Sequence, residues 1–269
     1  MQTDAVQPVF FLSHGGGPWP WLDGPMRTAY AKLEACLRAL PASLPQTPRA
    51  AIFITAHWEA PQFTLSAGAN PGMLYDYGGF PPHTYQISYP APGAPELAQE
   101  VCASLQAGGL RAALDHVRGY DHGVFTPAAV IWPQAQMPIL QISLQAGLDP
   151  AAHLQLGRLL APLRAQGVLI IASGLSYHNL RNFGPGAASA SAQFDAWLQE
   201  ACCRLAGEAR NARLCDWRQA PAAMQAHPRE EHLIPLLCAA GAAQEDAAQC
   251  CYHETDFVGG VVVSSFRFG

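Results

Sequence analysis

The chain has 269 residues, of which half are hydrophobic and only 13% are charged. This composition is typical of a globular protein with a sizeable core and excludes an intrinsically disordered chain. The net charge is −5 and the sequence pI is about 6.0, so the protein has no electrostatic attraction for nucleic acid or for an anionic membrane surface. We therefore expect neither as a partner.

Short runs of apolar and β-branched residues alternate along the chain with longer segments of helical character. We predict strands at Pro8–Ser13, Ala50–Ala56, Pro138–Leu144, Val168–Ser173 and Val261–Phe266. We predict helices at Pro25–Leu40, Ala94–Ala107, Ala151–Ala165, Ala190–Glu208 and Glu230–Ala240. This alternation indicates an α/β fold with a mostly parallel central sheet flanked by helices. Because no repeat or charged linker interrupts it, we predict a single domain over residues 1–269.

The sequence also bears on the compartment. It opens without the basic and apolar regions of a signal peptide, and its longest apolar runs, such as Val168–Ala172, are too short to span a bilayer. The eight cysteines include two adjacent pairs, Cys202–Cys203 and Cys250–Cys251, and no C-x-x-C spacing. We expect reduced thiols in a cytoplasmic protein. The oligomeric state is left open.

The segment from Gly68 to Pro95 is rich in glycine, proline and tyrosine and has no periodic pattern. We predict a long loop there, and loops of this length in compact domains often cover a binding site. Its aromatic residues, Tyr75, Tyr77, Phe80 and Tyr85, are candidates for stacking on an aromatic ligand. Loop aromatics more often simply pack against one another.

Three of the five predicted strands are each followed by a histidine, namely His14, His57 and His178. In open α/β sheets, ligands bind in the crevice outside the carboxyl ends of the strands. One such histidine is usually structural, but three at the same edge predict a shared site.

Two motifs near these histidines could indicate other functions, but neither motif is complete. Gly15–Gly17 match neither the P-loop nor the dinucleotide-binding pattern, so we expect a tight turn that lets backbone approach the site. Ser173–Ser176 lacks the final glycine of a nucleophile elbow, which disfavours a serine hydrolase.

Two further histidine clusters lie in the second half of the chain. Asp121 precedes His122 in a predicted loop, either as a turn residue or to fix the histidine tautomer, and His122 is equally well explained as a hydrogen-bonded loop residue. His227 precedes Pro228, which suits the start of a helix, and His232 falls in the first turns of that helix. The spacing is not H-E-x-x-H, so a zincin protease is not indicated.

Six ordered motifs together resemble those of the class III extradiol ring-cleavage dioxygenases, in particular the single-chain 4,5-DOPA dioxygenase branch. The motifs are SHGGGP at 13–18, TAHWE at 55–59, GFPPHTYQISYPAPG at 79–93, DHGVFTP at 121–127, SGLSYHNL at 173–180 and HPREEHLIPLL at 227–237. The resemblance covers nearly the whole chain, and six motifs in order are far more specific than any one of them.

The resemblance implies an α/β fold that holds one non-haem Fe(II), with Zn(II) sometimes in its place. It implies that His14 and His57 are metal ligands and that His232 is the third. Better-known relatives use a glutamate as the third ligand, so a carboxylate ligand from Glu230 or Glu231 stays an alternative.

The resemblance also implies roles for the remaining histidines. His178 matches the acid–base residue, with a fourth metal ligand as the alternative, and His122 matches a histidine that hydrogen-bonds to substrate or oxygen. The tryptophans of Trp19–Trp21 replace smaller residues of the family, so we expect them to narrow the pocket. The implied activity is the opening of a DOPA-like or other small catechol ring, with both atoms of O2 incorporated.

Three ligands on one face of Fe(II) leave the other face for catechol and O2, which is why this chemistry needs such a triad. One alternative is a zinc hydrolase that uses the same histidines and needs no O2. A second is a non-enzymatic binding protein of the same fold that has a vacant metal site. Oxygen uptake and metal content separate the three.

Overall fold

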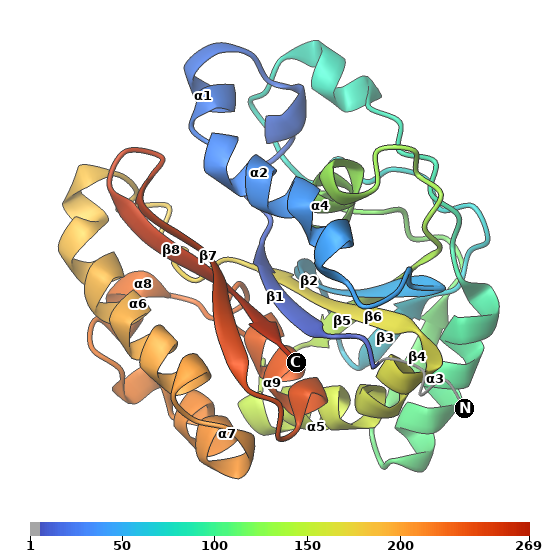
Figure 1. Cartoon of the computed structure of the whole chain (residues 1–269). Coiled ribbons are helices and arrows are strands. Elements are labelled where there is room, and N and C mark those ends of the chain that lie inside the picture. Colours follow the sequence, from blue (N-terminus) through green and yellow to red (C-terminus); the bar gives the residue numbers. More distant parts are fainter. Residues whose placement is uncertain (1–5) are drawn as a thin grey trace.

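The computed structural model describes residues 6–269, and all eight of their strands belong to one sheet (Figure 1). The strand order across the sheet is β4-β3-β5-β2-β6-β1-β8-β7. The strands are β1 (Val9–Ser13), β2 (Ala50–Ala60), β3 (Phe63–Ser66), β4 (Ala112–Asp115), β5 (Ile139–Gln145), β6 (Val168–Gly174), β7 (Ala248–Phe257) and β8 (Val261–Phe268). The pairs β1–β6, β2–β5, β2–β6 and β3–β4 are parallel, whereas β1–β8, β7–β8 and β3–β5 are antiparallel. The predicted α/β fold with a mostly parallel sheet is confirmed.

The five predicted strands are all present, and three more were missed. β1 and β6 are buried along their whole length because helices cover both faces of the sheet, which explains their continuous apolar sequences. β3 and β4 have only four residues each, too few for a periodic pattern. β7 lies at the sheet edge and contains several polar residues, so its sequence gives a weak strand signal.

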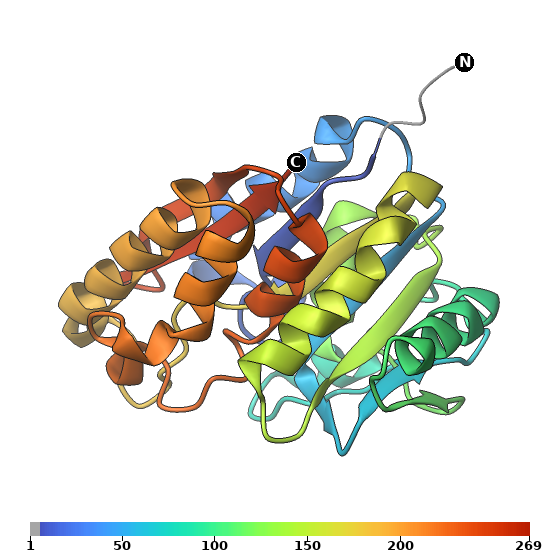
Figure 2. The same ribbon diagram turned by 90° about the horizontal axis from the view of Figure 1, so that it is seen from below.

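Helices cover both faces of the sheet (Figures 1 and 2). α2 and α4 pack together over one face, whereas α5 and α9 pack together beneath the other, where α3, α6 and α7 also lie. The helices are α1 (Gly24–Thr28), α2 (Ala31–Ala39), α3 (Pro95–Ala107), α4 (His122–Ile131), α5 (Pro150–Leu160), α6 (Ala188–Cys203), α7 (Gly207–Cys215), α8 (Ala223–Ala226) and α9 (Pro235–Ala243). No helix in residues 6–269 is long and apolar enough to cross a membrane.

Proline and capping residues set several helix starts. Pro150 opens α5, and the Asp149 side chain before it accepts hydrogen bonds from the backbone N–H groups of Ala151 (3.4 Å) and Ala152 (3.2 Å). Pro235 likewise opens α9, because proline lacks the N–H that a helix interior requires.

Three predicted helices need correction. The helix predicted at Glu230–Ala240 begins only at Pro235, so His232 lies in the turn before α9. The helix predicted at Pro25–Leu40 is divided into α1 and α2, and the one predicted at Ala190–Glu208 ends at Cys203 before α7 begins. The predicted long loop is present, with a short 3-10 turn at Pro82–Gln86.

Candidate metal centre

The predicted histidines meet at the carboxyl ends of the central parallel strands. His14 directly follows β1, and His178 comes four residues after the end of β6. His57 was expected past the end of its strand but lies inside β2. There the pairing of β2 with β6 has ended at Thr55, and the register with β5 shifts after Ile54. This local break leaves the His57 side chain at the same edge of the sheet as His14.

The turn before α9 brings His232 to the same edge. The backbone N–H of Leu175, just after β6, donates to the carbonyl oxygen of His232 over 3.0 Å. A Cβ atom at Gly174 would lie 2.2 Å from that oxygen, which no side chain tolerates. The glycine at position 174 therefore allows the close approach of the segment that carries His232.

Three imidazole Nε2 atoms converge at this point. Nε2 of His57 lies 3.1 Å from Nε2 of His14 and 3.2 Å from Nε2 of His232. The three side chains form a group whose potential ligand atoms all lie within 4.8 Å of one another. Nitrogens bound to one first-row ion at about 2.0–2.1 Å are separated by roughly 2.9–3.4 Å. The separations thus fit a shared ion.

The same three imidazoles are held in their neutral form. Burial, with the neighbouring histidines adding to it, lowers the pKa values of His14 and His232 well below 6.5 and that of His57 to about 3. A neutral imidazole offers a lone pair to a metal, whereas a protonated one does not.

A serine fixes the ring of His14. Nδ1 of His14 lies 3.1 Å from Oγ of Ser173, and that hydroxyl donates its own hydrogen to the carbonyl oxygen of Gly123. The serine oxygen must therefore accept from Nδ1–H of His14, which leaves the lone pair on Nε2. A partner behind a ligating histidine commonly sets its tautomer in this way.

Asp76 from the long loop holds two histidines at once. Its Oδ2 lies 3.2 Å from Nδ1 of His57, and its Oδ1 lies 2.9 Å from both Nδ1 and the backbone N of His122. Burial alone would raise the pKa of Asp76, but the hydrogen bonds from His122 outweigh it and hold that pKa below its usual value. The sequence around Asp76 has no pattern that predicts these contacts.

Asp121 does not fix the tautomer of His122, which is the role that Asp76 takes. Asp121 instead accepts a 2.8 Å hydrogen bond from Oγ1 of Thr55 and pairs with Arg118. Burial raises the pKa of Asp121 to about 6. Asp121 is the residue before α4, so His122 begins this helix and does not lie in a loop.

Glu231 holds the other two histidines. Its Oε1 lies 2.9 Å from Nδ1 of His232 and 3.1 Å from Nδ1 of His178, and the rings of these histidines stack with centroids 3.4 Å apart. Glu230 points to a different partner, Arg218. Each of the two carboxylates, Asp76 and Glu231, thus joins one member of the converging triad to one further histidine.

These histidines line a cavity of about 480 Å³. Its lining consists of His14, Gly15, Gly16, Gly17, Met26, Tyr30, His57, Asp76, Phe80, His122, Leu175, His178, Leu180, Phe183, His232, Phe257 and Val258. Gly15 and Gly17 have left-handed backbone conformations, with φ of 81° and 55°, so the glycine run is a tight turn beside His14, as predicted.

The aromatic residues near the cavity only partly follow the predictions. Neither tryptophan of Trp19–Trp21 lines the cavity, although both were expected to narrow it. Trp19 is fully buried, donates a 2.8 Å hydrogen bond from Nε1 to the carbonyl oxygen of His14, and stacks on Tyr30. Of the four loop aromatics only Phe80 lines the cavity. The Tyr75 and Tyr77 hydroxyls donate to backbone carbonyls of the same loop.

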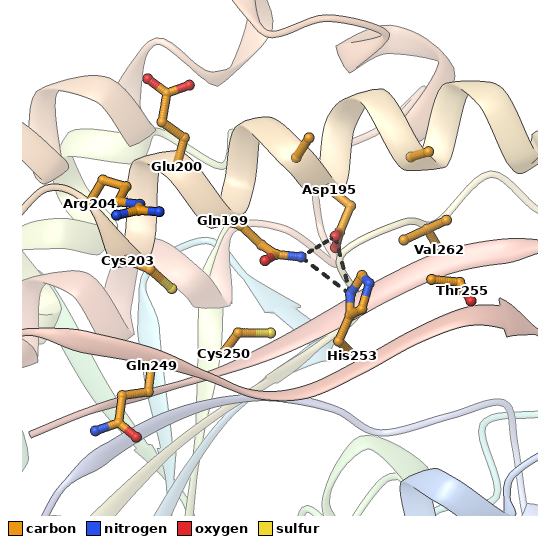
Figure 3. A pocket seen from close by; sticks show the side chains of 12 residues that line it. Asp195, Gln199, Glu200, Cys203, Arg204, Gln249, Cys250, His253, Thr255 and Val262 are labelled. Carbon is orange, nitrogen blue, oxygen red and sulfur yellow. Dashed lines mark hydrogen bonds and ion pairs between the residues drawn. The ribbon is translucent and has the colours of Figure 1, made fainter.

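A larger hollow of about 730 Å³ lies between α6 and the β7–β8 hairpin (Figure 3). Asp195, Gln199 and His253 point toward one another there. Within residues 6–269, this hollow contains no group of three potential metal ligands. The chemistry therefore favours the smaller, histidine-lined cavity as the functional site.

Comparison with known proteins bears on the reaction. Residues 8–264 match the family of the catalytic LigB subunit of aromatic ring-opening dioxygenase. The chain belongs to this family. It is 38% identical to dioxygenase tasH of Hapsidospora irregularis, over 98% of this chain and 86% of that protein. It is 35% identical to the 4,5-DOPA dioxygenase extradiol of Beta vulgaris, over 98% of this chain and 97% of that protein.

A solved structure shares the fold of this chain. The crystal structure of an uncharacterized protein from Escherichia coli K12 has a TM-score of 0.76 and 27% sequence identity, and the match covers 98% of this chain and all of that one. The protein is thus an aromatic ring-opening dioxygenase, and the resemblance to class III extradiol enzymes is confirmed. Dioxygenases of this family depend on a metal, and the histidine cluster offers a site for one.

Proposed function

We propose that the protein is a non-haem Fe(II) extradiol dioxygenase that opens a small catechol with O2, and that His14, His57 and His232 hold the metal. The convergence of three neutral Nε2 atoms on a cavity, each ring oriented from behind, is the observation that carries the proposal. Fe(II) bound there would supply open positions at which a catechol and O2 can meet.

The alternative carboxylate ligands are less well placed. Glu230 is engaged with Arg218, and Oε1 of Glu231 faces two Nδ1 atoms. We therefore assign Glu231 as a positioning residue for His178 and His232. His178 is not among the three histidines whose Nε2 atoms converge, which favours an acid–base role over a fourth ligand.

His178 is the proton acceptor in this proposal. Imidazole exchanges protons readily near neutral pH, and His178 lines the cavity with its Nδ1 held by Glu231. Its other ring nitrogen is left to take a proton from a catechol hydroxyl and to return it later. Glu231 keeps the ring from rotating during both transfers.

His122 has a complementary role. It lines the same cavity, and Asp76 holds both its Nδ1 and its backbone N–H. With Nδ1–H donating to Asp76, the imidazolium form of this ring would have Nε2–H free to donate to a substrate oxygen, and it would stabilise negative charge as it develops there. His178 and His122 therefore divide proton transfer and charge stabilisation between them.

Anaerobic loading with Fe(II), followed by air and a catechol panel, tests the proposal. We expect uptake of one O2 per catechol and a yellow semialdehyde product. The Zn(II)-loaded enzyme should be folded but inactive, because zinc has no accessible redox step. Full metal loading without O2 uptake on any catechol would instead favour the hydrolase, and failure to take up Fe(II) would indicate a binding protein. A His14→Ala variant should lose both metal and activity.

A further inference from the structure

The cavity beside the histidine cluster offers no lysine or arginine among the described residues that line it. Asp76 is the only carboxylate in that lining, and it is already bonded to His57 and His122. Away from the histidines, the lining side chains are apolar or aromatic: Met26, Tyr30, Phe80, Leu175, Leu180, Phe183, Phe257 and Val258. A carboxylate placed against this apolar part of the lining would find no lysine or arginine there to pair with.

Three exposed apolar side chains border the opening of this cavity. Met26 of α1 is 52% exposed, Leu180 after β6 is 73% exposed, and Val258 between β7 and β8 is 38% exposed. We call these three residues the collar. They come from segments far apart in the sequence, yet all line the same cavity. Apolar side chains gathered in the open at a cavity mouth are typical of a surface that contacts a ligand.

Val258 of the collar also has an unusual backbone. Its φ is 49°, in the left-handed region that residues with a branched β-carbon rarely adopt. Gly259 and Gly260, which follow, also have positive φ, so glycine or asparagine would be the expected residue at this turn. A strained valine that points an apolar side chain at the cavity mouth indicates a role for that side chain.

Two arginines, Arg181 and Arg229, line a neighbouring cavity and not the histidine-lined one. Arg229 pairs with Glu59 over 2.6 Å and with Glu231 over 3.4 Å. Arg181 lines a neighbouring cavity of about 530 Å³, which shares only His178 and Leu180 with the first. Arg229 is therefore occupied by two carboxylates, and Arg181 does not line the histidine-lined cavity.

We infer that the enzyme selects uncharged catechols that carry an apolar substituent, and that the collar contacts this substituent. The inference rests on the proposed function and names its substrate class. The cavity volume of about 480 Å³ lies in the range of roughly 300–1,000 Å³ that is typical of sites for ligands larger than a single ring.

A matched pair of substrates tests this inference. We compare 3- and 4-propylcatechol with the corresponding dihydroxyphenylpropanoates, which have the same chain length but end in a carboxylate. For the Fe(II)-loaded enzyme, kcat/KM from oxygen uptake should be at least about tenfold higher for the propylcatechols. Equal or higher kcat/KM for the carboxylates would overturn the inference.

Variants of the collar residues test whether the collar causes the preference for uncharged substrates. Met26→Lys should reduce the ratio of the two kcat/KM values about tenfold, because the added ammonium can pair with the carboxylate. Met224→Lys is the matched control, since Met224 is also 52% exposed but does not line the cavity, and it should leave the ratio unchanged. Val258→Gly should lower kcat/KM for propylcatechol by a larger factor than for catechol, without lowering the melting temperature. If Met26→Lys leaves the ratio unchanged, the collar does not contribute to substrate selection.

Failure of this inference is distinguishable from failure of the proposed function. If unsubstituted catechol consumes no O2 with the Fe(II)-loaded enzyme, the proposed function fails. If catechol is oxidised but the carboxylates are preferred, only the substrate class is wrong. In that case an Arg181→Ala variant would show whether the neighbouring cavity holds the carboxylate.

Discussion

Replacing Asp76 with asparagine keeps the side-chain size but removes one of the two acceptors that position His57 and His122. One oxygen becomes an NH2 group, which cannot accept from Nδ1–H at the present separations of 3.2 Å from His57 and 2.9 Å from His122. Whichever ring faces the amide must rotate or change tautomer. Loss of such a partner typically lowers metal affinity or activity about 10- to 100-fold, equivalent to about 1.4–2.8 kcal/mol.

The assay is an anaerobic Fe(II) titration against a competing chelator, with kcat and KM measured on the same preparations. Asp195→Asn is the matched control, because Asp195 also contacts a histidine, His253 at 3.4 Å, but in the hollow between α6 and β7 (Figure 3). We expect the control to bind Fe(II) normally. Wild-type Fe(II) affinity and wild-type kcat in Asp76→Asn would refute the positioning role of Asp76.

Three further variants test other parts of the site and fold. His178→Ala should keep one metal per chain while kcat falls at least about 100-fold, and loss of the metal would show that His178 is a ligand. Gly174→Ala should weaken Fe(II) binding and stability because its Cβ would collide with the carbonyl of His232, whereas Gly78→Ala, whose Cβ meets nothing within 4 Å, should do neither. Burial lowers the pKa of His227 to about 4 from 6.5. Because the unfolded chain gains this proton first, the metal-free protein should lose up to about 3 kcal/mol of stability as the pH falls from about 6.5 to 4. In urea unfolding, His227→Gln should lose less stability over this pH range than the wild-type protein does. Identical pH profiles of stability for the two proteins would contradict this expectation.

The sequence predicted much of the sheet and the location of the site for a physical reason. Continuous apolar runs can be read directly as buried strands, and parallel strands place their carboxyl ends together. His14 and His178 follow from that rule. His57 was placed correctly in space although it lies within β2, because the strand loses its regular pairing before this residue.

The positioning residues could not be predicted in the same way. Asp76 lies in a loop without periodicity, and its contacts with His57 and His122 depend on how that loop returns to the start of α4. Trp19 shows the opposite error. Because this large residue is close to His14 in the sequence, we expected it in the cavity, yet its side chain is buried outside the cavity lining. Local sequence gives the direction of a strand or helix but not the path of a long loop.

The position of β1 between β6 and β8 has a consequence for biosynthesis. Val9 pairs with Phe268, so the strand that leads to His14 keeps one edge open until β8 has been made. A growing chain that already contains all five site histidines would still have this edge unprotected, and unpaired edges favour wrong association. We therefore expect the centre to gain stability when the last strand pairs with the first, and a shortened chain without β8 to bind the metal less tightly.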